Sequence, residues 1–444
     1  MTRPPLPSPA AATLSRSARF AQRGFTLIEL LVALTGGLFV SIAVFALARD
    51  ASRFYQREGR LASATLNAVV GFERLRADIA RAGFLVSPNV QRDPLVCSRP
   101  PQGGPSLLAN LASIQVTDGS KGTTPSPLAE NSRYPDSLLL AGSYSSTDEF
   151  VMRSVTSSGS GYEIILATDA GAMARLGWAA LQAEGKKDEA QRRLSDIFAT
   201  GRGLRIVDLE GRQHYGVIAG VTVDATLSQP SILLDGSVPL HFRDQDQSKL
   251  CGFNGPQTGA PVSVINFVRY QVKNLSATNN KNYAALFSSS KNAAIATYES
   301  QRTELVRTEL KANGDEMTQV VDGEAVARAE LVAEYAVDLQ FDVTAAIGTR
   351  GSLTVQYFKG ARGDAAADAD FATYTGPALT DSNLPERARS LRAMLMVRSR
   401  EPDREAPGPV GYRIGLGPEG KLPYARTRTL QAEVALTNNV NAEW

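Results

Sequence analysis

The sequence has very little cysteine, histidine and tryptophan, with two residues of each in a chain of 444. So few sulfur and imidazole groups exclude a zinc finger or an iron–sulfur cluster. A histidine-dependent hydrolase would need His214 or His241, and neither has neighbours spaced as in a catalytic triad or a metal site. We therefore expect no enzymatic activity and no cofactor.

An excess of one charge is also missing, because 47 Lys and Arg face 45 Asp and Glu. Nucleic-acid-binding domains usually have a strongly basic balance or stripe, so we expect no nucleic-acid partner. A hydrophobic content of 43% argues against both a polytopic membrane protein and a disordered chain. Composition thus favours a large soluble body that carries one special segment.

That segment is the one long apolar run, from Phe25 to Ala48, whose single charge is Glu29. At ~1.5 Å per helical residue it is long enough to cross a hydrocarbon core of ~30 Å. Residues 1–24 before it contain four arginines and no acid. The positive-inside rule then keeps residues 1–24 in the cytoplasm and predicts a single span, with the body exported.

The residues where the run begins differ from a secretory signal, which has its small-residue cleavage site after the apolar core. Here the small residue Gly24 precedes the run, in the string Arg-Gly-Phe-Thr-Leu-Ile-Glu-Leu at 23–30. This string closely resembles the class III signal of type IV pilins and type II secretion pseudopilins. The resemblance implies that a prepilin peptidase cuts between Gly24 and Phe25, removes the leader 1–24 and N-methylates Phe25.

Glu29 is a carboxylate inside an otherwise uncharged membrane helix, which is costly and marks a functional residue by default. The resemblance implies that Glu29 pairs with the Phe25 amine of a neighbouring subunit during assembly. The alternative is a side chain near the helix end that reaches the membrane surface. Gly36 and Gly37 lie mid-span and mark either a close-packing face or a point where the helix loosens.

Proline is absent from Phe25 to Ser87, so one long helix is allowed. Residues 25–48 would be its transmembrane half and residues 49–86 its soluble, amphipathic half, ended by Gly83 and Pro88. Apolar residues recur there at steps of three and four, as on one face of a helix. They are Phe54, Leu61, Ala68, Phe72, Leu75, Ile79 and Ala82.

The rest of the chain reads as loops and strands. Residues 87–135 are rich in Pro, Gly and Ser and predict a loop insertion with little regular structure. Residues 136–444 predict a β-rich globular domain, with a helical patch at 172–183 and 188–198 and surface insertions at 252–262, 275–298 and 359–389. Strands are expected at 137–141, 150–155, 162–167, 203–207, 216–223, 231–234, 263–273, 304–310, 333–343, 352–358, 392–398 and 430–436.

Two cysteines in an exported domain suggest one disulfide, Cys97 to Cys251, which would staple the first loop to the region 249–262. The alternative is two unpaired thiols.

Two further patterns carry little weight. Asp364, Asp368 and Asp370 could offer oxygens to Ca²⁺, but their spacing is not that of an EF-hand, so we read an acidic loop. The glycines of Gly-x-Gly-x-x-Gly at 415–420 match a dinucleotide fingerprint in spelling. Pro418 prevents a helix from opening there, so we read a turn.

Several short segments resemble PilW-type minor pilins in order: 75–84, 136–140, 304–307, 331–341 and 389–399. The resemblance implies an α+β, pilin-like fold, in which a long N-terminal helix packs on a β-rich domain with large loop insertions. It also implies an inner-membrane protein with a periplasmic body. This protein would later join other minor pilins and the major pilin to initiate, or sit at the tip of, a type IV pilus used in motility and adhesion.

A large pilus-tip adhesin is a further candidate partner. Two alternatives remain open: a J-type minor pseudopilin of a type II secretion system, and a membrane-anchored periplasmic binding protein.

Overall fold

The computed structural model describes residues 25–444, except 102, 120–123, 160, 170, 244–250, 256, 276–282, 284, 285, 287–301, 322, 350, 351, 361–384, 401–410, 415–423 and 440–444. Within helices and strands it leaves out the side chains of residues 57, 60, 61, 63, 64, 67, 98, 126, 348, 349, 352 and 353. The chain divides into two compact units, Met1–Glu58 and Gly59–Trp444, and each is described by itself.

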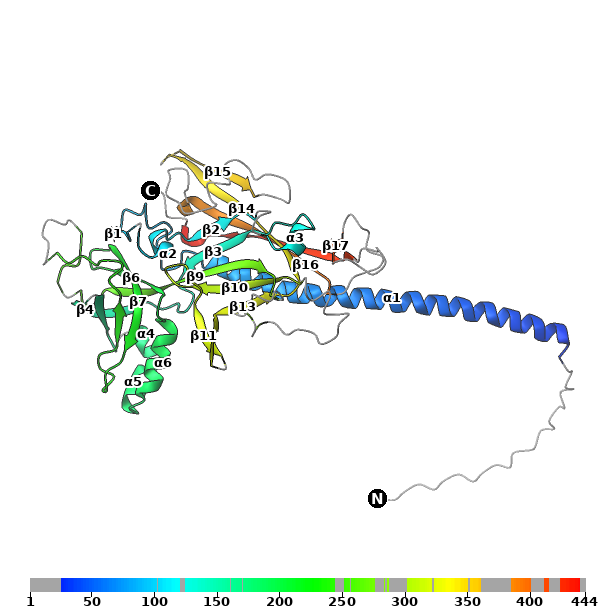
Figure 1. Ribbon diagram of the computed structural model, residues 1–444, viewed down its shortest axis with the longest axis horizontal. Helices are drawn as coiled ribbons and strands as arrows, with labels where there is room; N and C mark the ends of the chain where they lie inside the picture. The colour runs from blue at the N-terminus through cyan, green and yellow to red at the C-terminus, as the bar shows by residue number, and fades with distance from the viewer. Residues whose placement is uncertain are drawn as a thin grey trace, which may run out of the picture. The chain divides into compact units, whose positions relative to one another are not determined.

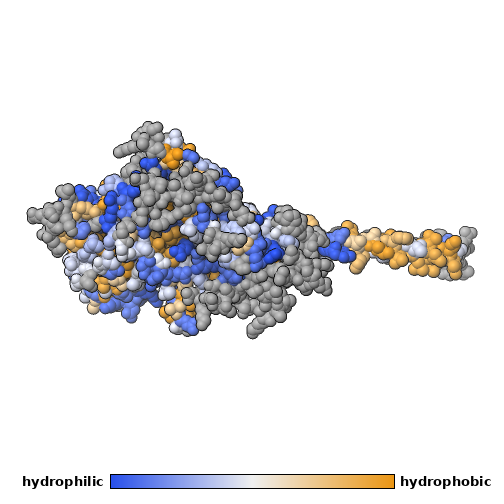
Figure 2. All heavy atoms as spheres, turned by 45° about the horizontal axis from the view of Figure 1, so that its top comes forward, coloured by the Kyte–Doolittle hydropathy of each residue, from blue (hydrophilic) through white to orange (hydrophobic). Residues whose placement is uncertain are grey.

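Helix α1 runs from Leu27 to Ala80 without interruption. In the first unit, its stretch Leu27–Gln56 is 30 residues long and contains an 18-residue window with a mean hydropathy of 2.5, none of which is buried. It is the one helix among the described residues that is long and apolar enough to cross a membrane. Figure 2 shows this stretch as a largely hydrophobic rod. The long N-terminal helix of the predicted fold is thus confirmed.

The helix ends at Ala80, six residues before the expected boundary at 86. The N–H groups of Arg81 and Ala82 donate to carbonyls three residues back, which tightens the last turn. Gly83 follows with a φ of +76°, and its N–H donates to the carbonyl of Ala141 in the sheet. The helix therefore ends early because the backbone N–H of Gly83 forms its hydrogen bond with β3 (Ser137–Gly142) and not with the preceding helical turn.

The second unit is built on an 11-stranded sheet whose main path is β1-β7-β8-β5-β4-β9-β10-β13 (Figure 1). Strand β3 joins through β9, β2 pairs with β3, and β6 pairs with both β7 and β9. The described pairs are antiparallel except β1 with β7. The strands are β1 (Val96–Ser98), β2 (Ile114–Thr117), β3 (Ser137–Gly142), β4 (Phe150–Ser158), β5 (Gly161–Leu166), β6 (Gly203–Val207), β7 (Gln213–Thr222), β8 (Ser231–Leu234), β9 (Pro261–Lys273), β10 (Glu304–Leu310) and β13 (Ala329–Ala333).

A second sheet of four antiparallel strands has the order β15-β14-β16-β19. Its strands are β14 (Ala336–Thr349), β15 (Ser352–Lys359), β16 (Ala388–Arg398) and β19 (Thr427–Ala435). The hairpins β11 (Thr318–Val321) with β12 (Glu324–Ala327) and β17 (Tyr412–Arg413) with β18 (Tyr424–Ala425) stand apart from both sheets, and short 3₁₀ turns occur at Pro385–Arg387 and Thr437–Asn439.

The strand expected at 333–343 is in fact two strands in different sheets, β13 and β14. Tyr335 lies between them with a φ of +56°, a left-handed conformation that is uncommon for a large side chain. Its N–H donates to Glu304 Oε2 at 2.8 Å, and its ring lies 5.0 Å from the guanidinium carbons of both Arg302 and Arg398. These contacts fix the backbone at Tyr335, where the chain passes from β13 of the first sheet to β14 of the second.

One core joins the second-unit part of α1 to both sheets. The helix buries Ala68, Phe72 and Leu75, together with Ile79 and Ala82, against β3, β9, β10 and the inner face of β14 and β16. The predicted apolar face is therefore confirmed from Ala68 onward. In the first unit, Phe54 is 59% exposed, so the face does not extend back to it, and the side chain of Leu61 lies outside the described residues.

Residues 143–260, between β3 and β9, form what we call the inserted lobe, whose strands β4 to β8 are part of the 11-stranded sheet. These strands, three helices and the start of β9 enclose a second core, in which Trp178, Phe198 and Phe253 are fully buried. The helices are α4 (Gly171–Arg175), α5 (Trp178–Ala183) and α6 (Lys187–Ile197), which confirms the predicted helical patch within a residue or two.

Residues 87–135 are more ordered than expected. They contain β1, β2 and two one-turn helices, α2 (Ser106–Ala109) and α3 (Ser126–Ala129). Ile114 and Val116 of β2 are buried beside β3, and Leu108 of α2 is fully buried. These short elements were not predicted within the loop insertion, because strands this short are set by contacts with the rest of the sheet rather than by their own sequence.

Candidate functional site

The start of α1 is organised by a reciprocal pair of side chains, Thr26 and Glu29. The N–H of Glu29 donates to Thr26 Oγ1 at 3.3 Å, while the N–H of Thr26 donates to Glu29 Oε2 at 2.9 Å. The Thr26 hydroxyl also donates to Oε2 at 2.9 Å. All three contacts use Oε2 or the hydroxyl, and none uses Glu29 Oε1.

This arrangement is a capping box, in which a Thr and a Glu three residues later satisfy each other's backbone N–H groups at a helix start. The Thr-x-x-Glu spacing was visible in the sequence, and our sequence analysis considered Glu29 only as a charge. The carboxylate therefore has a local role in starting the helix at Leu27, in addition to any role in assembly.

The residues next to this cap, at the start of α1, are apolar and exposed to solvent. Phe25 is 86% exposed and Leu27 82% exposed, while Gly24, on the other side of the expected cleavage site, lies outside the described residues. The helix continues unbroken through Gly36 and Gly37, and a Cβ at either position would meet nothing within 4 Å. Among the described residues, none therefore packs against the helix at these two glycines.

The second-unit part of α1 has an exposed apolar stripe opposite its buried face. Leu66 and Val70 are each 66% exposed and Val69 is 41% exposed. These three residues are spaced at steps of one, three and four, so they share one side of the helix. We call them the outer stripe.

The buried side of α1 is tied to the sheet by Asp78, which is 2% exposed. Its Oδ2 accepts from Tyr270 Oη and from Arg307 Nε, both at 2.7 Å, and its backbone carbonyl accepts from Tyr144 Oη at 2.9 Å. Burial, together with the Asp78 charge, raises the pKa of Tyr270 well above its usual value, so both tyrosines stay protonated donors. A lone acid beside the apolar face was the sequence signal for this anchor.

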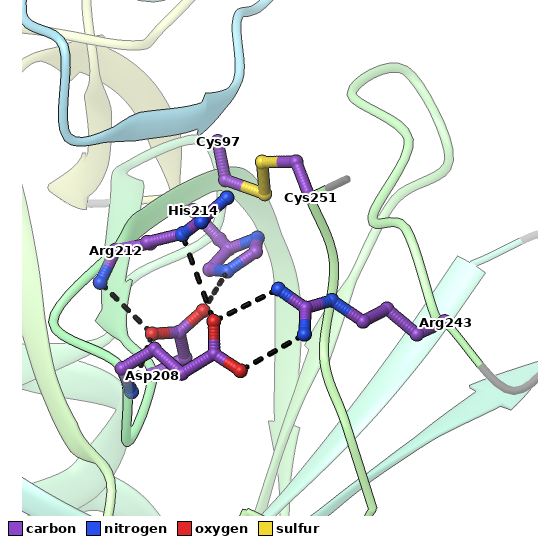
Figure 3. Close-up of a disulfide and its surroundings, with 7 residues drawn as sticks. Cys97, Asp208, Arg212, His214, Arg243 and Cys251 are labelled. Carbon is purple, nitrogen blue, oxygen red and sulfur yellow. Dashed lines mark hydrogen bonds and ion pairs between the residues drawn. A yellow bond between two sulfur atoms is a disulfide. The ribbon is translucent and has the colours of Figure 1, made fainter. Parts of the chain in front are cut away.

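The expected Cys97–Cys251 disulfide is present in the structure, with the two Cα atoms 5.5 Å apart. It joins β1 to the inserted lobe (Figure 3). Beside it, His214 Nε2 and Asp208 Oδ2 are 2.9 Å apart, and both side chains are buried. His214 thus has an acidic partner that the sequence spacing did not reveal, six residues before it on the turn between β6 and β7.

Metal and nucleotide sites find little support in the described residues. They contain no group of three or more His, Cys, Asp or Glu side chains that could hold a metal ion. The candidate calcium residues Asp364, Asp368 and Asp370 and the glycine pattern at 415–420 lie outside the described residues.

Two buried carboxyl groups have perturbed pKa values for structural reasons. Burial raises the pKa of Asp136 to about 8, although its oxygens accept the N–H groups of Gly119 and Phe341. Burial likewise raises the pKa of Glu304 to about 7 against the opposing effect of Arg302. Asp136 accepts the N–H of Phe341 within β14 and Glu304 accepts the N–H of Tyr335 just before it, so their role is to hold the two sheets together.

Comparison with known proteins adds one finding. The family model for the prokaryotic N-terminal methylation motif matches residues 19–35, which include Gly24, Phe25 and Glu29. No curated protein and no solved structure matches the chain. The motif, placed at the start of an exposed apolar helix that leads into a β-rich body, supports a pilin-like protein, either a pilin or a pseudopilin, that is processed by prepilin peptidase and anchored in a membrane by one span.

Proposed function

We propose that this chain is a minor pilin of the PilW type. After cleavage between Gly24 and Phe25, it co-assembles with other minor pilins to initiate a type IV pilus or to sit at its tip, and major pilin is added to this complex. Its role is structural and not enzymatic. The observation that carries the proposal is the methylation motif at 19–35, located where α1 begins its fully exposed apolar stretch.

The cap at Glu29 supports a role in assembly. Because the contacts with Thr26 use Oε2, the second carboxylate oxygen is left to accept a hydrogen bond from the methylated amine of Phe25 on a neighbouring subunit. Such a pair removes two uncompensated charges from the membrane interior at once. The Glu29 side chain can then cap the start of α1 and bind a neighbouring subunit at the same time.

The outer stripe argues against a simple membrane anchor. Leu66, Val69 and Val70 lie beyond the apolar stretch and remain exposed although the opposite face of the helix is fully packed. A helix that only tethers a binding protein has no need of apolar residues there. Packing against helices of neighbouring subunits would bury the stripe and gain about 25 cal/mol for each Å² of apolar surface removed from water.

The cleavage step is tested by intact-mass measurement of the membrane protein from cells with and without prepilin peptidase. We expect the native chain to begin at Phe25 with one added methyl group, and Gly24→Val to remain uncut. Gly36→Ala is the matched control, since a Cβ at Gly36 meets nothing and cleavage should be normal. A mature N-terminus at any other residue would refute the proposal.

The assembly step is tested by deleting the gene in a background that lacks other minor-pilin sets. We expect fewer surface pili and less surface motility, with major pilin accumulating in the inner membrane. Normal piliation combined with failure to secrete folded exoproteins would instead assign the chain to a type II secretion pseudopilin.

A further inference from the structure

The region around the disulfide has an unusual construction. Strand β1 is only three residues long, and its register with β7 shifts between Val96, opposite Gln213, and Ser98, opposite His214. Cys97 lies in this irregularity, so one half of the disulfide sits against the start of β7. The other half, Cys251, begins the short described stretch 251–255 of the inserted lobe.

This stretch covers a buried polar pair. Phe253 is fully buried and stacks on the imidazole of His214, with ring centroids 4.1 Å apart. The imidazole in turn contacts Asp208, and Figure 3 shows it between that carboxylate and the disulfide. Among the described residues, His214 Nδ1 is buried without a hydrogen-bond partner.

The backbone of Phe253 is held by two hydrogen bonds to residues 241 and 243. Its N–H donates to the carbonyl of His241, and its carbonyl accepts from the N–H of Arg243. Arg243 is fixed in turn by a two-pronged contact with Glu210, whose carboxylate is partly exposed. The disulfide is the covalent link from this stretch to β1, and it acts together with the Arg243–Glu210 pair and the burial of Phe253 in the core of the inserted lobe to keep Phe253 over His214.

We propose that Cys97–Cys251 is a redox-controlled clasp that holds residues 251–255 over the His214–Asp208 pair. Reduction by an external dithiol transfers two electrons and two protons, which gives two cysteine thiols and leaves the reductant as a disulfide. The stretch then lifts from β7, and water reaches the imidazole. Opening gives Nδ1, which is buried without a partner among the described residues, a hydrogen bond to water, and this gain offsets part of the cost of exposing Phe253.

The clasp is local. The core that holds α1 against the sheets contains none of these residues, so reduction opens one end of the inserted lobe and leaves the helix-bearing core closed. Both cysteines are partly exposed, which gives a reductant or a thiol–disulfide oxidoreductase direct access. The closed form therefore belongs to an oxidising compartment, and a reduced subunit presents Phe253 and Phe242 to solvent.

The chain offers a simple readout because it has only two histidines. The full-length protein in detergent is treated with diethylpyrocarbonate, either oxidised or after reduction with dithiothreitol, and modification is mapped by mass spectrometry. His241, which is partly exposed, serves as the internal reference. We expect His214 to be unmodified in the oxidised protein and to approach the modification of His241 after reduction. The Cys97→Ser/Cys251→Ser variant should behave as the reduced form without reductant.

Hydrogen exchange separates a clasp from a general staple. Exchange should rise at residues 213–215 and 251–255 on reduction and stay unchanged at 68–82. Equal protection of His214 in both redox states would overturn the proposal, and so would faster exchange across 68–82. Phe253→Ala with the disulfide intact should also increase the modification of His214, and failure to do so would show that Phe253 is not the cover.

Discussion

Two glycines of α1 in the second unit should respond to the same substitution in opposite directions. Gly71 faces β13, and a Cβ built on it would lie 2.2 Å from the carbonyl oxygen of Val332 and 2.9 Å from its carbonyl carbon. Gly59 is exposed on the same helix, and a Cβ there would meet nothing within 4 Å. The perturbation we consider is therefore alanine at each position.

The magnitudes follow from two opposing terms. Alanine in place of glycine inside a helix stabilises by about 1 kcal/mol, and this term applies at both positions. At Gly71 the new methyl group meets backbone atoms that have no rotamer with which to move aside, so the helix must shift from the sheet. Overpacking of this kind costs about 1–3 kcal/mol or more. We expect Gly59→Ala to be neutral or stabilising and Gly71→Ala to be less stable than Gly59→Ala by about 1–3 kcal/mol, which leaves a net loss of up to about 2 kcal/mol after the helix gain is subtracted.

The assay is urea or thermal unfolding of the full-length protein in detergent, followed by circular dichroism. Gly59→Ala serves as the control for helix propensity, so the difference between the two variants isolates the close approach of α1 to β13. If Gly71→Ala stabilises the protein as much as Gly59→Ala does, the helix does not pack on Val332 as described.

The remaining predictions concern the anchor, the cap and pH. Asp78→Ala should cost up to about 3–5 kcal/mol in the same unfolding assay, because it leaves the buried Arg307 with only its longer contact to Glu330. Glu73→Ala, which breaks an exposed pair on the same helix, should cost less than about 1 kcal/mol, and equal costs would contradict the anchor. Glu29→Gln should be cleaved and methylated normally but incorporated poorly into sheared pili, since it keeps the size of the side chain and removes its charge; normal incorporation would favour a carboxylate that only reaches the membrane surface. The pKa of Asp136, raised by burial from 3.8 to about 8, means that the folded protein retains a proton that the unfolded chain has lost. Stability should therefore fall as pH rises from about 4 to about 8, by at most ~1.4 kcal/mol per pH unit from this group, and Asp136→Asn should flatten that slope; an unchanged slope would assign the pH dependence to other groups.

Much of the strand pattern was visible in the sequence. The bounds of β6, β8 and β10 agree with the expected ranges to the residue, because each is a short run of apolar and β-branched residues between clear turns. The apolar face of α1 was equally clear from Ala68 onward, where the spacing of three and four residues has no competing pattern.

What the sequence could not show depends on contacts between distant segments. The break at Tyr335 falls inside a run that reads as one strand, since its positive φ is imposed by Glu304 and two arginines from other strands. Strand β2 was missed for the same reason, because its partner β3 lies beyond a stretch rich in Pro and Gly. The role of Asp78 could not be assigned before Tyr270 and Arg307 were known to reach it.

At the candidate site, the prepilin signal was readable because it is a local string recognised by an enzyme rather than a product of folding. The Thr26–Glu29 cap was also local and could have been found from spacing. The pairing of His214 with Asp208 is different, because it follows from a tight turn between β6 and β7 and from burial under Phe253. Composition alone offered no signal for it.

The inserted lobe begins and ends at neighbouring points of the 11-stranded sheet. Gly142, at the end of β3, is directly opposite Asn266 of β9, and the side-chain oxygen of Asn266 accepts the N–H groups of Tyr144 and Ser145 as the chain departs. Because the two ends of the lobe lie beside each other, its length can change at little entropic cost to the helix-bearing core, provided that β4 and β6 keep their pairing with β9. The fold therefore separates two rates of evolutionary change: the surfaces that must fit a common assembly stay with the helix, while the lobe is freer to diversify.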